Sequence, residues 1–241
     1  MPTRRFRPPL WSIPLVLILT AVFLSAGTWQ LRKGWHKQAV GQALEAAPAS
    51  TPVDLDVHAP APQSEQVTRG RAVGRYVTER QLLLDGQTRG RTPGYRVWTP
   101  LALEGGGAII VDRGWVPADP HRERLPAVGV DDSPRRVTGL WRPLPEPGMR
   151  LGTHACDGAF PRVVNYPDAA AIACIVGSPV APGVLLLDPA ALDGFTREWQ
   201  LPDALPPSRH YGYAAQWFAF AATLLFLFFR YSFRVVDEHA R

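Results

Sequence analysis

The residue with the clearest capacity for chemistry is His210, which stands where a polar segment gives way to a long apolar run. Three aromatic residues follow it within two helical turns: Tyr211, Tyr213 and Trp217. An ionisable side chain at the mouth of an apolar helix is a candidate for function. An imidazole there can ligate a haem iron while the aromatic rings pack on the porphyrin. The alternative is that His210 and Arg209 only anchor the helix at a membrane surface.

The two cysteines, Cys156 and Cys174, belong to no Cys-x-x-Cys pair and have no histidine at zinc-finger spacing. We therefore expect no structural metal site. In an oxidising compartment the two thiols can form a disulfide that closes a loop of about 18 residues and contributes about 3 kcal/mol. The alternative is a free thiol, because Cys174 lies in an apolar run where cysteine behaves as a small hydrophobic residue.

No other group of residues requires an enzymatic interpretation. The sequence contains no P-loop and no Gly-x-Ser-x-Gly, His-Glu-x-x-His or Gly-x-Gly-x-x-Gly motif. Three histidines of the middle segment, His58, His121 and His154, stand singly among Pro or Gly residues and are read as surface residues. The pair Asp131-Asp132 precedes Ser-Pro and is typical of a turn. We expect no catalytic residue.

Composition and charge exclude some classes of partner. Of the 241 residues, 46% are hydrophobic and 20% are charged, which suits one soluble domain with membrane segments. The net charge of +5 would be compatible with a nucleic-acid binder. Many arginines, however, flank two apolar segments: Arg4, Arg5, Arg7, Arg32, Arg230 and Arg234. Because no basic stripe with aromatic platforms remains, we expect a lipid bilayer and no nucleic acid as partner.

The two apolar segments, residues 11–31 and 211–229, carry no formal charge. At 1.5 Å per residue, each can cross a bilayer core of about 30 Å as a helix. For the first segment the alternative is a cleaved signal peptide, since three arginines precede it and residues 25–27 are small. The length of its apolar run favours an uncleaved anchor.

Both tails are short and basic, which places them in the cytoplasm and residues 33–208 on the other side. Arg32, Lys33 and Lys37 weaken this charge count, but two spans must leave both tails on one side. The predicted organisation is a cytoplasmic tail (1–10), a first transmembrane helix (11–31), a helix extension with a Pro-rich linker (32–65), an extracytoplasmic domain (66–208), a second transmembrane helix (209–230) and a cytoplasmic tail (231–241).

The middle domain is predicted to be β-rich, with an antiparallel sheet or a barrel and one short helix, and the fold class is therefore α+β between two transmembrane helices. The strand-like runs are 66–76, 81–84, 95–103, 108–111, 136–141 and 184–187. The glycines at 105–107 predict a hairpin between the third and fourth runs. The helix begins after Asp168 as its cap and ends at Gly177. Residues 48–62 are expected to be an extended linker outside the core.

Three groups of residues carry a family resemblance. They are Gly27-Thr-Trp29-Gln30-Leu-Arg32-Lys-Gly-Trp35 at the first span, Gly94-Tyr-Arg-Val97 with Val111-Asp-Arg113-Gly114-Trp115-Val116-Pro117 in the domain, and His210-Tyr-Gly-Tyr213-Ala214-Ala-Gln216-Trp217-Phe218 at the second span. With these blocks, nearly the whole chain resembles the surfeit-locus-one family of cytochrome c oxidase assembly factors. Residues 151–160 depart from the usual pattern of that family.

The resemblance implies a non-catalytic factor that assists haem a insertion into the catalytic subunit of cytochrome c oxidase. It implies transient haem a binding through His210, and the catalytic subunit and haem a delivery proteins as partners. The expected location is a bacterial inner membrane with a periplasmic domain, the mitochondrial inner membrane being the alternative. A tethered scaffold or sensor that binds only proteins, and a haem-modifying enzyme, are the competing classes. No flavin or nicotinamide fingerprint and no second axial ligand supports the enzyme.

The residues outside the His210 block also have interpretations that do not depend on the family. Trp29 and Gln30 suit an interfacial anchor. Arg113-Gly114-Trp115 follows a buried strand, where Gly permits a bulge, Trp covers the sheet and Arg can reach a carbonyl or carboxylate. A structural role is favoured here over contact with a partner.

Overall fold

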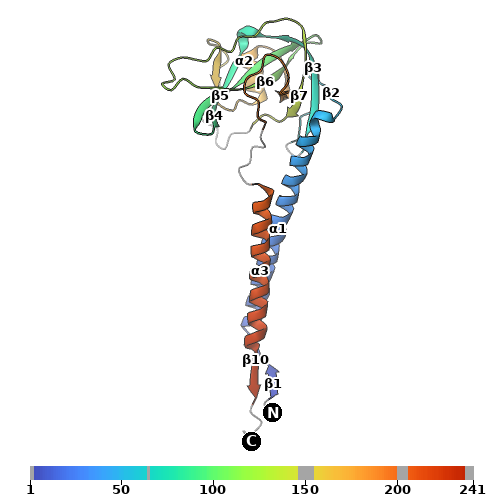
Figure 1. Ribbon diagram of the computed structural model, residues 1–241, viewed down its shortest axis with the longest axis vertical. Helices are drawn as coiled ribbons and strands as arrows, with labels where there is room; N and C mark the ends of the chain where they lie inside the picture. Colours follow the sequence, from blue (N-terminus) through green and yellow to red (C-terminus); the bar gives the residue numbers. More distant parts are fainter. Residues whose placement is uncertain (1–2, 64–65, 146–154, 200–205, 237–241) are drawn as a thin grey trace. The chain divides into compact units, whose positions relative to one another are not determined.

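The computed structural model describes residues 3–63, 66–145, 155–199 and 206–236. It divides into two compact units, one made of Met1–Gln42 with Leu201–Arg241 and the other of Ala43–Gln200. The first unit contains the two long helices and the second contains the sheet (Figure 1).

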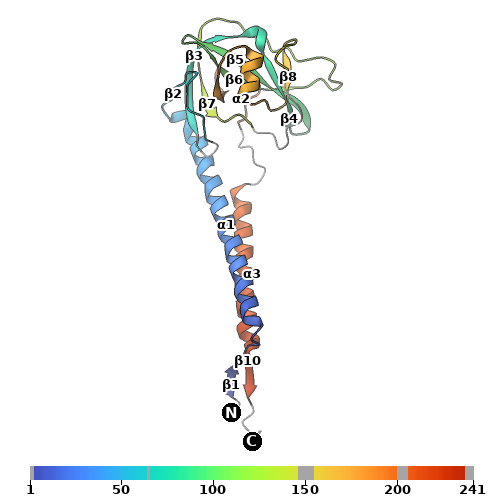
Figure 2. The same cartoon turned by 180° about the vertical axis from the view of Figure 1, so that it is seen from behind.

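Helix α1 (Ser12–Ala46) and helix α3 (Pro207–Ser232) are both long and apolar enough to cross a membrane. Their 35 and 26 residues correspond to roughly 52 and 39 Å at 1.5 Å per residue. The predicted first span covers only the apolar half of α1, because the helix continues without a break into the polar stretch after residue 31. The two helices run antiparallel and side by side in the first unit (Figures 1 and 2).

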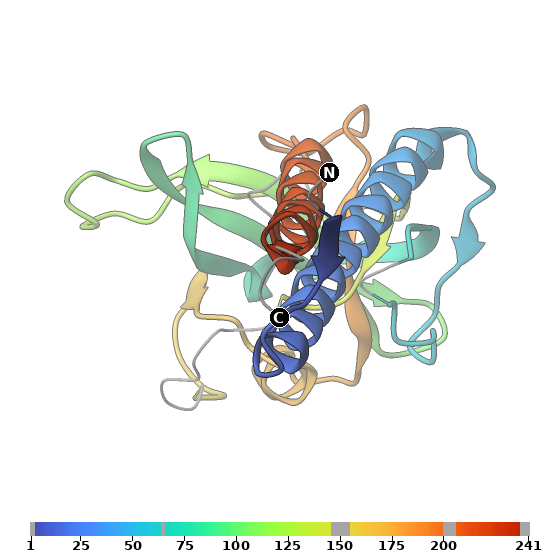
Figure 3. The ribbon, with the colours of Figure 1, turned by 90° about the horizontal axis from the view of Figure 1, so that it is seen from below.

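The two tails pair with each other, which the sequence did not predict. Strand β1 (Thr3–Phe6) pairs antiparallel with strand β10 (Phe233–Val236) at one end of the helix pair (Figure 3). The Phe6 ring lies 5.4 to 6.0 Å from the rings of Phe228, Phe229 and Phe233. Four-residue strands are too short for a reliable period-2 pattern. The pairing places both tails at the same end of α1 and α3, as two spans require.

The second unit is built on one eight-stranded sheet. Its strands are β2 (Val53–Asp54), β3 (Thr68–Tyr76), β4 (Leu82–Arg89), β5 (Thr92–Leu103), β6 (Ala108–Pro117), β7 (Arg135–Arg142), β8 (Arg162–Val164) and β9 (Val180–Leu187). The order is β2-β3-β7-β9-β6-β5-β4-β8, and a further pairing joins β3 to β5. That pairing closes β3, β7, β9, β6 and β5 into a barrel.

The sequence predicted either an antiparallel sheet or a barrel, and the strands form a barrel. The sheet is mixed, however, and not purely antiparallel. Strands β6 and β9 pair in parallel, as do β2 with β3 and β4 with β8. The short helix α2 (Ala169–Val176) lies between β8 and β9 and lets the chain return in the parallel direction. The predicted hairpin is present as the antiparallel β5–β6 pair, with residues 104–107 in its turn.

Glycine makes the closure of the barrel possible at Gly74, which pairs with Leu103. A Cβ atom at this position would lie 2.1 Å from the carbonyl oxygen of Ala102. Any other side chain would therefore push β3 away from β5.

The core has two main parts. Inside the barrel, Leu101, Ile109, Val111 and Leu185 are fully buried. On the other face of the sheet, Ile172 and Ile175 of α2 pack with residues of β4, β5 and β6, among them Trp98. Helix α2 begins as predicted, since the Asp168 carboxylate accepts a hydrogen bond from the Ala171 amide at 2.8 Å, and it ends at Gly177 in the left-handed conformation.

The Pro-rich passage is more than the linker that the sequence predicted. Strand β2 adds to the sheet, and Leu55 and Ala59 are buried in the core. A Cβ atom on Gly70 would lie 2.4 Å from the Leu55 side chain, so the bare backbone of β3 provides the space that Leu55 fills. Sparse apolar residues between prolines can thus anchor a segment that composition alone assigns to a linker.

Candidate functional site

The contact surface of the helix pair follows a regular spacing on both helices. On α1 the partly or fully buried residues include Thr20, Phe23, Gly27, Gln30 and Gly34, and on α3 they include His210, Ala214, Trp217, Phe218 and Ala221. Steps of three and four residues place each set along one stripe of its helix. Gln30 and His210 lie on these two stripes and face each other.

Two glycines bring α1 close to aromatic rings of α3. A Cβ atom on Gly27 would lie 2.7 Å from the Phe218 ring, and one on Gly34 would lie 2.6 Å from the Tyr211 ring. Small residues allow membrane helices to approach closely in this way. The rings of Phe218 and Tyr211 thus pack against α1 at Gly27 and Gly34, one before and one after Gln30.

The imidazole of His210 is bound by Gln30. Its Nδ1 atom lies 2.8 Å from the Oε1 atom of Gln30, and the His210 residue is 8% exposed. The other ring nitrogen, Nε2, is buried and has no hydrogen-bond partner among the residues that the structure describes. Buried polar atoms nearly always have a partner, so this nitrogen requires an explanation.

The aromatic residues predicted to surround His210 take different places. Trp217 packs on Phe23 and Phe220, with ring centroids 5.8 and 5.9 Å away. Tyr211 donates its hydroxyl hydrogen to Gln38 at 2.6 Å. Tyr213 is 44% exposed and Trp29 is 56% exposed, so both project from the contact surface between the helices. Trp217 packs within the helix pair, whereas the Tyr213 side chain is available at its surface.

The sequence suggested an interfacial anchor for Gln30 and a haem ligand for His210, and it did not predict that the two side chains bind each other. A usable signal was present in the spacing, because Gly27, Gln30 and Gly34 lie three and four residues apart. That pattern places one amide between two positions of close helix approach.

The second group of predicted residues, Arg113, Gly114 and Trp115, lies in strand β6 of the barrel. The block does not follow the strand, as the sequence suggested, but lies within β6, which continues to Pro117. Arg113 is 2% exposed and lies beside the rings of Phe195 and Tyr76. Its guanidinium donates hydrogen bonds to the carbonyl oxygens of Val128, Gly129 and Asp193, and to the side chains of Gln81 and Thr99. Burial lowers the pKa of Arg113 and raises the pKa of Tyr76 to about 12.

The neighbouring Asp112 is also buried. Its carboxylate accepts hydrogen bonds from the Trp98 indole at 2.8 Å, from the Arg96 guanidinium at 2.8 Å and from the Gly114 amide at 3.0 Å. Burial raises the pKa of Asp112, and the charge of Arg96 opposes that rise. The carboxylate ties β5 to β6 at the point where their register shifts.

Gly114 and Trp115 hold a later segment against the barrel. Gly114 has a φ angle of 115°, and a Cβ atom there would lie 2.7 Å from the carbonyl oxygen of Thr196. The Trp115 amide donates to the same oxygen at 2.8 Å, and the Phe195 amide donates to Arg113 at 2.7 Å. The Arg113-Gly114-Trp115 block therefore holds the segment at residues 193–196 against β6, which is a structural role.

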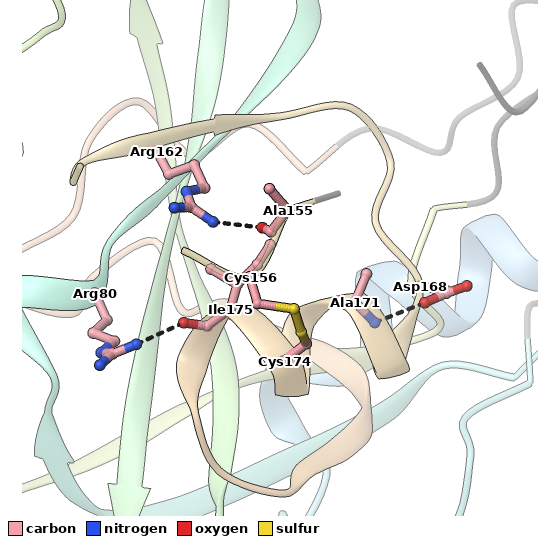
Figure 4. Close-up of a disulfide and its surroundings, with 8 residues drawn as sticks. All are labelled: Arg80, Ala155, Cys156, Arg162, Asp168, Ala171, Cys174 and Ile175. Atoms are coloured by element: carbon pink, nitrogen blue, oxygen red, sulfur yellow. Dashed lines mark hydrogen bonds between the residues drawn. A yellow bond between two sulfur atoms is a disulfide. The ribbon is translucent and has the colours of Figure 1, made fainter. Parts of the chain in front are cut away.

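Cys156 and Cys174 form a disulfide with a Cα–Cα distance of 5.2 Å (Figure 4). It ties the segment before β8 to helix α2. The same region is held by Arg162, which donates to the Ala155 carbonyl at 2.6 Å, and by Arg80, which donates to the Ile175 carbonyl at 2.8 Å. Residues 151–154 of the segment that departs from the family pattern, His154 included, lie outside the described residues.

A metal-binding cluster of three or more His, Cys, Asp or Glu side chains does not occur among the described residues. Among the described residues, Thr20 Oγ1, Arg69 Nε, Arg197 Nε and His210 Nε2 are buried without a hydrogen-bond partner. Of these four atoms, the imidazole nitrogen is the usual metal ligand. The residues present thus fit a group that takes one axial nitrogen ligand and an apolar surround.

The architecture defines a class of protein in which two helices, each long and apolar enough to cross a membrane, flank a β-barrel domain in the sequence. The sequence model of the SURF1 family matches residues 17–222, and the chain belongs to that family. The resemblance to surfeit-locus-one proteins is thereby confirmed, and the family is linked to cytochrome oxidase assembly. A comparison with curated proteins finds no match.

Proposed function

We propose that this protein is a non-catalytic assembly factor for cytochrome c oxidase, which holds haem a transiently through His210 while the haem enters the catalytic subunit. The observation that carries the proposal is the buried, unpartnered Nε2 atom of His210 between α1 and α3. The family membership gives the process that the site serves.

Residues of α1 and α3 would have different roles in binding haem. His210 would hold the haem iron through its ring nitrogen, and the apolar side chains of α1 and α3 would exclude water around it. Trp217 stabilises this part of the helix pair by packing on Phe23 and Phe220. The exposed ring of Tyr213 offers a surface on which a macrocycle can pack. When bound, haem a supplies a redox-active iron that the oxidase needs. The catalytic subunit and haem a delivery proteins are the proposed partners.

We also propose that α1 and α3 span a bacterial inner membrane and that the barrel domain is periplasmic. Arginines occur within the paired strands, at positions 4, 5 and 234, and next to them, at positions 7 and 230, which favours the cytoplasm for that end. The Cys156–Cys174 disulfide is the kind of bond that persists in the periplasm.

Replacing His210 by Ala is expected to abolish the Soret band of the protein purified from cells that make haem a. The haem a content of the oxidase in the same cells should fall. Stability should change little, because the substitution removes one hydrogen bond and no part of the barrel core. The visible spectrum and the abundance of the protein are measured on the same membrane samples.

The control is His36→Ala, which removes an exposed histidine of α1 and should keep the spectrum of the unaltered protein. If His210→Ala retained the Soret band and normal oxidase assembly, the ligand role would be excluded. Absence of haem from the unaltered protein would favour a scaffold that binds only proteins, and turnover of the bound haem would favour a haem-modifying enzyme.

A further inference from the structure

The hydrogen bond between Gln30 and His210 can determine both the orientation and the tautomer of the His210 ring. We infer that Gln30 is the positioning residue of the site: it fixes the orientation and the tautomer of the His210 ring, so that Nε2, and not Nδ1, is presented to the iron. This inference rests on the proposed function of His210 as the haem ligand.

The tautomer follows from the atoms that face each other. The atom of Gln30 at 2.8 Å from Nδ1 is the amide oxygen Oε1, which accepts hydrogen bonds and cannot donate them. This contact is a hydrogen bond when Nδ1 of His210 carries the hydrogen of the neutral imidazole, and that is the tautomer we assign. Nε2 is left with its lone pair, and a nitrogen in that state is a metal ligand.

The position of the Gln30 amide is itself determined by the helix contact. Gly27 and Gly34 bring α1 against the rings of Phe218 and Tyr211, so the backbone of α1 lies close to α3 before and after Gln30. A side chain between two such contacts has little freedom to turn away. The amide is thereby held beside the imidazole before any ligand binds.

A bond of this kind has a known effect on metal sites. A ligating histidine usually donates its second ring N–H to a carbonyl or carboxylate, which fixes the ring and raises the basicity of the ligating nitrogen. Loss of such a partner lowers metal affinity by about 10- to 100-fold. Without Gln30, His210 can rotate or exchange tautomers, and an N–H can then occupy the position of the lone pair.

The test compares three variants of the full chain in detergent. Gln30→Met keeps the length of the side chain but removes its hydrogen-bonding amide, and Gln30→Glu restores an acceptor for Nδ1–H. Gln38→Met is the matched control, because it breaks a second hydrogen bond between the helices, that of Tyr211, without touching His210. The ring nitrogen resonances of His210 in the haem-free protein report the tautomer, and titration with haem a reports affinity.

The unaltered protein should show the Nδ1–H tautomer, and Gln38→Met should match it in tautomer and affinity. Gln30→Met should give mixed tautomers and bind haem a about 10- to 100-fold more weakly. Gln30→Glu should recover most of the affinity and shift the reduction potential of the bound haem to a lower value, since a carboxylate raises imidazole basicity further.

An unchanged tautomer in Gln30→Met would overturn the inference. So would equal losses of affinity in Gln30→Met and Gln38→Met, because these would indicate a general loosening of the helix pair. A failure of the proposed function has a different signature, in which His210→Ala binds haem a as well as the unaltered protein does.

Discussion

Replacing Arg113 by Ala is expected to destabilise the barrel domain by about 3 to 5 kcal/mol. The substitution leaves three backbone carbonyls and the side chains of Gln81 and Thr99 without their buried donor. It also opens a space beside the rings of Phe195 and Tyr76. Chemical denaturation of the purified full chain, followed by tryptophan fluorescence, measures the loss.

Two further arginine variants sharpen this prediction. Arg113→Lys should also be strongly destabilised, because an ammonium group cannot reproduce the fork of donors that reaches several carbonyls. Arg136→Ala on β7 removes an exposed arginine and should change stability by less than about 0.5 kcal/mol. An Arg113→Ala protein as stable as Arg136→Ala would contradict the structural role assigned to the buried guanidinium.

The second large effect concerns the disulfide. Replacing both Cys156 and Cys174 by Ala should lower the stability of the domain by about 3 kcal/mol, because the bond closes a loop of 18 residues. A reducing agent should lower the stability of the unaltered protein by a similar amount and leave the double variant unchanged. Denaturation curves with and without reductant measure both effects.

The same bond reports the compartment of the domain. In cells, the two thiols should resist alkylation until a reductant is added, since a periplasmic domain is oxidised. A reporter fused near residue 120 should be active on the periplasmic side, and one fused after the C-terminal tail should be active in the cytoplasm. Free, readily alkylated thiols in intact cells would overturn the proposed orientation.

The features that sequence predicted well are those with a strong local signal. Helix α2 has a capping Asp168 and a terminal Gly177, and the β5–β6 hairpin has three glycines in its turn. Each of these is encoded within a few neighbouring residues. The two long apolar helices are equally local, because length and composition suffice to identify them.

The features that sequence did not predict depend on residues far apart in the chain. Closure of the barrel joins Gly74 to Leu103, and the parallel pairing joins Val111 to Leu185. Strand β2 is short and rich in Pro at its flanks, so its place on the sheet depends on Leu55 fitting over Gly70. Such complementarity between distant segments leaves no periodic signal in one sequence.

For the candidate site, the sequence singled out His210 and Gln30 but did not predict that they bind each other. His210 and Gln30 are 180 positions apart, and their bond depends on the relative rotation of α1 and α3. The Arg113 block was assigned a structural role in advance, yet its acceptors at residues 128, 129 and 193 lie in segments without a strand signal. Contacts with loop carbonyls cannot be read from residue types.

The division of the His210 site between the first and the last helix has a consequence for biosynthesis. Gln30 leaves the ribosome early, His210 follows only after the whole barrel domain has been made, and the β1–β10 ribbon joins segments that are translated at opposite ends of the process. The site therefore cannot exist in a nascent chain in which α3 has not yet been made. A chain interrupted before α3 would lack His210, so under the proposed function only a completed chain could bind haem a through this site.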